Sequence, residues 1–164
     1  MITDDTNLRA AHKRAVIIAA AFMGSLFIYA VITEFFLKDI PVPVEPSVYP
    51  YLRYLLVAVA AVEVIAMVIL KNIILSGKIK LKTESKIFST ETKENEFIQR
   101  LFTSVLITYA LSESIALFGF ILFVMGKNRT EFYAFLGIAF FLMMVNFPKY
   151  EDWESRFRDF SEDY

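Results

Sequence analysis

The sequence contains no cysteine, one histidine, five glycines and five prolines in 164 residues. Without cysteine there is no disulfide, thiol nucleophile, iron–sulfur cluster or thiolate zinc site. A single histidine, His12, excludes His-based metal clusters and most catalytic triads, so we expect no metal and no cofactor. The 17 basic and 18 acidic residues leave a net charge of −1, which provides no basic field to attract nucleic acid. We therefore expect neither an enzyme nor a nucleic-acid-binding protein.

Charge is also missing from four long stretches of this chain, which is 57% hydrophobic. A helix needs about 20 mainly apolar residues to cross a hydrocarbon core about 30 Å thick. The sequence predicts an all-α membrane protein whose transmembrane domain, residues 15–147, contains four transmembrane helices in the lipid bilayer. These helices are expected at about 14–37, 52–75, 97–125 and 130–147. Barrel strands are excluded because the stretches are continuously apolar rather than alternating.

The segments between these stretches carry turn and loop signals. Prolines punctuate residues 40–50, and Gly126 begins a tight turn that joins the last two helices into a hairpin. Residues 76–96 form a long charged loop, in which Thr90 or Thr92 is a suitable helix N-cap. In the tail, 148–164, four aromatic residues recur at helical spacing. They predict either an amphipathic helix at the lipid headgroups or an aromatic belt with a frayed acidic tail: Tyr150, Trp153, Phe157 and Phe160.

The distribution of basic residues predicts the orientation in the membrane. With both termini in the cytoplasm, the inner segments hold Arg9, Lys13 and Arg14, seven basic residues from Lys71 to Arg100, and three in the tail. The outer side then keeps only Lys38, Arg53, Lys127 and Arg129. Because cytoplasmic loops are enriched in Lys and Arg, we expect an N-in, C-in, multi-pass protein of a bacterial-type inner membrane. Residues 1–14, loop 76–96 and the tail are then cytoplasmic, and the first helix is a retained signal anchor.

Two carboxylates interrupt the apolar stretches near their midpoints, Glu63 in the second and Glu113 in the third. A charge at bilayer mid-depth costs about 2.5–3.5 kcal/mol on insertion scales, so it persists with a partner, a water-filled cavity or a function. No Lys, Arg or His lies within residues 15–33, 54–70, 101–126 or 132–147, the apolar runs themselves. We expect the two carboxyls to lie at similar depth and to hold a proton or a cation. The alternatives are that each merely ties two helices together through a hydrogen bond, or that a carboxyl contacts a lipid, a quinone or a partner subunit.

The residues around Glu113 predict a supporting environment. Tyr109 lies one helical turn away on the same face, and Ser112 and Ser114 lie on either side, where hydroxyls would satisfy a protonated carboxyl. Glu34 is expected to pair with Lys38, four residues on. Tyr29 is expected to be an ordinary helix-contact residue.

Residues 110–119, Ala-Leu-Ser-Glu-Ser-Ile-Ala-Leu-Phe-Gly, resemble the carboxylate helix of the rotary ATPase proteolipids, the ATP synthase subunit c family. The resemblance implies that Glu113 corresponds to the proton- or sodium-binding carboxylate, and Phe118–Gly119 to the aromatic–glycine pair that follows it. The chain departs from the family in its longer inner loop, its two additional helices and the absence of glycine from the preceding helix. Residues 21–30 align weakly with 110–119, which favours two helical hairpins, with Gly24 opposite Glu113.

Two functions follow from these patterns. The first is a proteolipid-like subunit or accessory of an ion-linked membrane complex, with Glu113 and secondarily Glu63 as protonatable sites. The second is a structural or assembly protein whose carboxyls only lock helices together. Four helices bury little surface between themselves, so we expect a homo-oligomer or membership of a larger membrane complex.

Overall fold

The computed structural model describes residues 2–36, 47–76 and 93–162, with side chains from residue 7 onward in the first helix and from residue 96 onward in the third, up to residue 160. In this part of the chain all regular structure is helical. The five helices are α1 (Ile2–Phe35), α2 (Tyr49–Leu75), α3 (Lys93–Gly126), α4 (Arg129–Val145) and α5 (Tyr150–Glu162).

Local sequence signals begin and end several of these helices. Pro50 stands in the first turn of α2, where its missing N–H is not needed. Lys127, with a φ of 55°, adopts the left-handed conformation that ends α3. Asn128 then caps α4, because its Oδ1 accepts the backbone N–H of Glu131 at 3.3 Å. The α3–α4 hairpin is therefore closed by only two residues.

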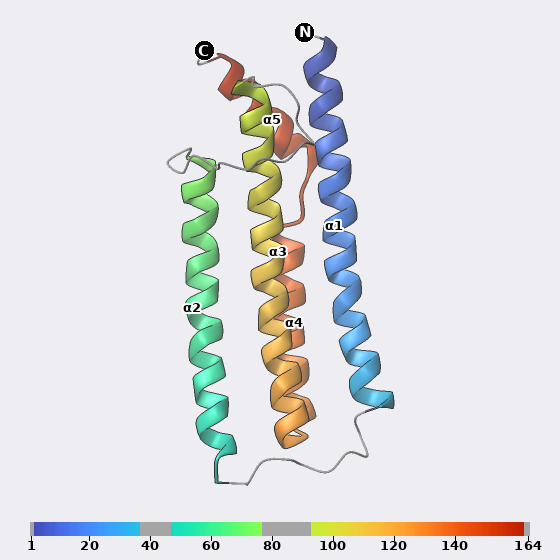
Figure 1. Cartoon of the computed structure of the whole chain (residues 1–164), viewed down its shortest axis with the longest axis vertical. Coiled ribbons are helices and arrows are strands. Elements are labelled where there is room, and N and C mark those ends of the chain that lie inside the picture. Colours follow the sequence, from blue (N-terminus) through green and yellow to red (C-terminus); the bar gives the residue numbers. More distant parts are fainter. Residues whose placement is uncertain (1, 37–46, 77–92, 163–164) are drawn as a thin grey trace.

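Helix α3 lies at the centre of the molecule, with α1, α2 and α4 packed around it (Figure 1). In the described residues, α1 and α2 make no close contact with each other, so α3 joins them. Both termini and α5 lie at one end of the bundle, which we call the upper end, as in Figure 1. The turn between α3 and α4 lies at the opposite, lower end.

Helices α3 and α4 approach each other closely at Gly119. A side-chain Cβ at Gly119 would lie 2.5 Å from the Phe135 Cβ and 3.1 Å from the Phe132 carbonyl oxygen. Small residues allow helices to approach in this way in membranes. The main core lies between α1, α3 and α4, and α2 packs against it; its buried members are Ala19, Leu26, Tyr109, Ile115, Ala116, Leu122, Phe135, Ala139 and Met143.

A second apolar cluster fixes α5 at the upper end. Trp153, only 4% exposed, packs with Leu8 and Ala11 of α1 and with Ile98 and Leu101 of α3. The same face of α5 continues with Phe157 and Phe160, both in ring contact with Phe97. The predicted tail helix therefore exists, and its aromatic side packs on protein rather than on lipid headgroups.

Three helices are long and apolar enough to cross a membrane, with spans at Asn7–Phe35, Tyr49–Leu75 and Glu96–Gly126. A fourth span exists if α4 and α5, which are bent by 49° at their break, count together. Large apolar side chains are exposed along these helices, for example Phe27 at 66% and Val62 at 64%. These properties indicate a multi-pass membrane protein.

The predicted and observed helix limits differ most in α1 and α3. Helix α1 begins at Ile2 rather than near residue 14, because its polar first turns pack Leu8, Ala11 and Ala15 against α3 and α5. Helix α3 begins at Lys93 rather than near residue 97. Most of the predicted loop 76–96, with its N-cap candidates, lies outside the described residues, as do Lys38 and most of the proline-rich segment.

Candidate functional site: two carboxylates in the apolar belt

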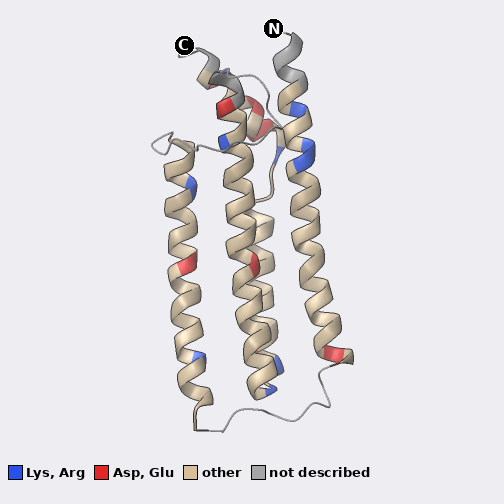
Figure 2. Cartoon of the chain, viewed as in Figure 1, with Lys and Arg blue, Asp and Glu red and all other residues tan. Residues whose placement is uncertain are grey.

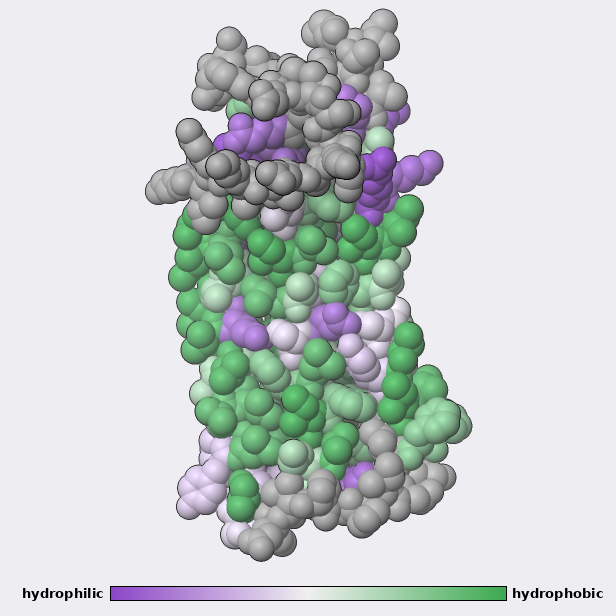
Figure 3. All heavy atoms as spheres, viewed as in Figure 1, coloured by the Kyte–Doolittle hydropathy of each residue, from purple (hydrophilic) through white to green (hydrophobic). Residues whose placement is uncertain are grey.

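Acidic residues interrupt the ribbons of α2 and α3 near mid-height (Figure 2). Glu63 and Glu113 are the only acidic residues within residues 49–75 and 97–126, respectively. Figure 3 shows two hydrophilic patches at this level, side by side on one face, with apolar surface above and below. Both side chains are partly exposed. We call Glu63 and Glu113 the belt carboxyls.

Glu113 is held by a residue of α1. The Tyr29 hydroxyl donates a hydrogen bond of 2.8 Å to Glu113 Oε1, which joins α1 to α3. The Tyr29 ring lies 5.8 Å from the ring of Phe120, which is about two turns beyond Glu113 along α3. A buried tyrosine hydroxyl normally finds a partner, and at this depth Glu113 provides one.

Glu63 is held by the residue that follows Glu113. Ser114 Oγ lies 2.5 Å from Glu63 Oε2 and 2.8 Å from the carbonyl oxygen of Leu111. A serine hydroxyl has one proton, so it donates fully to only one of these oxygens. Both contacts are strong hydrogen bonds when the Glu63 carboxyl is protonated and donates to Ser114 Oγ, while Ser114 donates to Leu111. Ser114 therefore links Glu63 of α2 to the backbone of α3.

Glu113 and Ser114 are adjacent on α3, so their two interactions lie at the same depth on different faces of the helix. Glu113 is directed to α1 and Ser114 to α2, as expected for side chains about 100° apart. The two carboxyls are thus each bonded to a hydroxyl rather than to each other. In the described residues neither carboxyl has a salt bridge.

Glu113 lies within the outward side of α3. The exposed residues on this side repeat every three or four positions, with the partly exposed Glu113 in the middle of the row. The others are Leu106, Ala110, Leu117 and Ile121. Leu106 is 39% exposed, Leu117 37% and Ile121 38%. In a bilayer this side would meet lipid or another protein, where a charged side chain is costly.

The other predicted supporting residues lie elsewhere. Tyr109 is fully buried, and its hydroxyl donates to the carbonyl oxygen of Met143 on α4 at 2.8 Å. Ser112 is also buried and bonds the Thr108 carbonyl oxygen at 2.8 Å. Neither hydroxyl bonds a carboxylate. Of the three predicted supporting residues, only Ser114 bonds a belt carboxyl.

Sequence reasoning missed Tyr29 as the partner of Glu113. Its position does carry a signal, because it belongs to a row at alternating four- and three-residue spacing along α1: Ala15, Ala19, Phe22, Leu26, Tyr29 and Thr33. All six are buried or half-buried. Such a row is typical of a helix face that packs against another helix, which would have directed Tyr29 toward the bundle.

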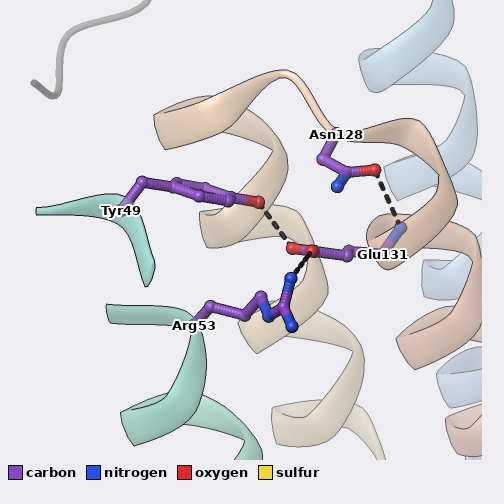
Figure 4. Close-up of polar contacts among 4 residues, drawn as sticks. All are labelled: Tyr49, Arg53, Asn128 and Glu131. Carbon is purple, nitrogen blue, oxygen red and sulfur yellow. Dashed lines mark hydrogen bonds and ion pairs between the residues drawn. The ribbon is translucent and has the colours of Figure 1, made fainter. Parts of the chain in front are cut away.

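A separate polar cluster closes the lower end (Figure 4). Glu131 accepts a hydrogen bond of 2.5 Å from the Tyr49 hydroxyl and one of 3.1 Å from Arg53 Nη1, so it joins α4 to α2. The Tyr49 ring also occupies the space that a Cβ at Gly126 would take. Glu131 has a cation partner, unlike the belt carboxyls.

Glu34 takes part in a similar contact between α1 and α4. The Tyr133 hydroxyl donates to Glu34 Oε1 at 2.8 Å, and Arg129 Nη2 lies 3.5 Å from Glu34 Oε2. These partners come from another helix, whereas the predicted partner, Lys38, lies outside the described residues. The lower end is therefore fixed by ion pairs, and the middle of the bundle by neutral donors.

The site consists of two carboxyls, each hydrogen-bonded to a hydroxyl of another helix. No group of three or more His, Asp or Glu that could hold a metal ion exists within residues 2–36, 47–76 and 93–162. No protein-family model, curated protein or solved structure matches the chain.

Proposed function

We propose that this chain is a four-helix, N-in, C-in inner-membrane protein in which the belt carboxyls hold a proton or a cation. It would serve as a proteolipid-like subunit or accessory of an ion-linked membrane complex. The observation that carries the proposal is the placement of Glu63 and Glu113 at one level of the apolar belt, each with a hydroxyl partner. A carboxyl so placed is expensive to ionise, so it takes up a proton or recruits a cation.

The geometry at Ser114 supports a proton as the held species. Its two contacts, to Glu63 and to the Leu111 carbonyl oxygen, are both satisfied when Glu63 is protonated. Loss of that proton leaves Glu63 and the carbonyl oxygen competing for one donor. Deprotonation of Glu63 would therefore alter the α2–α3 contact.

A helix-locking role is the second candidate, and it has its own observation. Glu63 connects α2 to α3, and Glu113 connects α1 to α3. In the described chain α1 and α2 make no close contact with each other. On this view the carboxyls only hold α1 and α2 on α3, and the protein has a structural or assembly role. A hydrogen bond between membrane helices contributes about 0.6–2 kcal/mol, which is enough for that purpose.

Thermal unfolding in nanodiscs separates the two candidates. A ligand that binds only the folded protein raises its unfolding temperature. If the carboxyls bind sodium, replacing choline by sodium raises the wild-type unfolding temperature. If they hold protons only when folded, lowering the pH from 8 to 6 raises it. Either response should disappear in Glu63→Gln/Glu113→Gln, which keeps hydrogen-bond acceptors at both positions.

The matched control is Glu131→Gln, which removes a carboxyl that is paired with Arg53 at the lower end. This variant should keep the sodium or pH response of the wild type. Equal responses of the wild type and the double variant would contradict the proton- or cation-binding role and leave helix locking as the better account.

A further inference from the structure

A pocket at the upper end collects basic side chains from three parts of the fold. Its volume is about 100 Å³, several times the roughly 10–15 Å³ that one water requires. Lys71 of α2, Lys149 before α5, and Arg156 of α5 line it, together with one acidic residue, Asp152. Apolar residues also line it, among them Leu101 and Val105 of α3 and the buried Trp153.

Hydrogen bonds fix the segment between α4 and α5 that forms one wall of this pocket. Lys71 Nζ donates to Asn146 Oδ1 at 2.8 Å, and Asn146 Nδ2 donates back to the Leu142 carbonyl oxygen at 2.9 Å. His12 Nε2 donates to the carbonyl oxygen of Pro148 at 3.0 Å. The rim of the pocket is thus held by α1, α2 and α4 before any ligand arrives.

No carboxylate in the described part of the chain neutralises the basic groups of the pocket, although Lys71 donates a hydrogen bond to Asn146. No salt bridge there joins Lys71, Lys149 or Arg156 to a carboxylate, and the Lys149 and Arg156 side chains are exposed. With Asp152 counted, the pocket keeps a net positive charge. Its position is the bend between α4 and α5, at the end of the apolar stretch of α4, where lipid phosphates lie in a bilayer.

We propose that this pocket binds the phosphate group of an anionic ligand, either a lipid headgroup or a free phosphate. Such a group is compact enough for the cavity and accepts hydrogen bonds from two lysines and an arginine. Helices α2 and α5 make no close backbone contact, so the bound phosphate bridges them. This inference is independent of the belt carboxyls and goes beyond the proposed function.

The test uses the full-length chain purified in a neutral detergent, with Lys149→Gln/Arg156→Gln as the pocket variant. Both side chains are exposed, so the variant should fold, which its unfolding temperature checks. The matched control is Lys13→Gln/Arg14→Gln, which removes the same charge from an exposed part of α1. Native mass spectrometry measures the affinity for phosphatidylglycerol and phosphatidylcholine, and ³¹P line broadening measures the affinity for inorganic phosphate.

The proposal expects at least a tenfold loss of affinity in the pocket variant, since each lost contact is a charge-assisted hydrogen bond. The control should change less than about threefold at 0.15 M salt, where distant charges are screened. If only the affinity for phosphatidylglycerol falls in the pocket variant, the ligand is a lipid headgroup. If the affinity for inorganic phosphate falls, the ligand is a free phosphate. The proposal would be overturned if, for both ligands, the pocket variant lost no affinity or lost only as much affinity as the control variant. Single Lys149→Gln repeats the test if the double variant unfolds.

Discussion

Individual residues determine how the belt carboxyls are held. Glu113 receives its hydrogen bond from Tyr29, a phenol on a different helix, whereas Glu63 shares Ser114 with a backbone carbonyl oxygen. The two sites therefore differ, although they lie at the same depth.

Substitutions of Glu113 should distinguish the need for an acceptor from the need for a charge. A glutamine keeps an oxygen that accepts the Tyr29 hydroxyl, so Glu113→Gln should accumulate in membranes close to the wild-type level. Glu113→Lys places a cation in the belt, at a cost of about 2.5–3.5 kcal/mol on insertion scales, and should accumulate several-fold less. Quantitative immunoblots of isolated membranes measure both variants, and equal abundance would contradict the account.

At the scale of helices, the contact of α3 with α4 depends on one glycine. Gly119→Ala places a Cβ against Phe135 and the Phe132 carbonyl oxygen, which should cost about 1–3 kcal/mol of unfolding free energy. Gly24→Ala on α1 is the matched control, because a Cβ there meets nothing within 4 Å. Unfolding in mixed bicelles compares the two. Helix propensity favours Ala over Gly at both positions, so similar changes in the two variants would contradict a specific packing role of Gly119.

Helix α5 depends on Trp153 for its attachment. Removal of this side chain in Trp153→Ala should cost about 3–5 kcal/mol of packing against α1 and α3, so α5 detaches before the bundle unfolds. Trypsin should then cleave at Arg156 and Arg158 much faster than in the wild type. Glu154→Ala, at an exposed position of α5, should leave the cleavage rate unchanged. Equal cleavage of Trp153→Ala and the wild type would show that α5 is held by other contacts.

The sequence predicted the helices that lie in apolar stretches better than the helical turns outside them. Hydropathy located α2 closely, but it carries no signal for the start of α1, where Leu8 and Ala11 face protein and their neighbours are polar. The belt carboxyls were found because a charge in an apolar stretch is visible in the sequence. Their partners depend on which faces of α1 and α2 are turned toward α3. The sequence of α3 alone does not predict those faces.

For the whole molecule, the arrangement of α1 and α2 on opposite sides of α3 leaves much apolar surface exposed. Phe27 of α1, Val62 of α2 and Ile121 of α3 all have substantial exposure. We therefore expect more than one copy, or additional subunits, in a native membrane. Native mass spectrometry of the protein released from native nanodiscs should give a protein mass above that of one 18.9 kDa chain. A sharp monomer mass would contradict this expectation.

The central claim is that Glu63 and Glu113 are carboxyls that hold a proton within the membrane. Hydrophobic carbodiimides react with protonated carboxyls in apolar surroundings, so labelling in native membranes from pH 5 to 9, read by peptide mass spectrometry, tests the claim most directly. We predict that both residues are labelled, that labelling falls as the pH rises, and that Glu131, paired with Arg53, stays unlabelled. Absence of labelling at Glu63 and Glu113 across this range would contradict the claim.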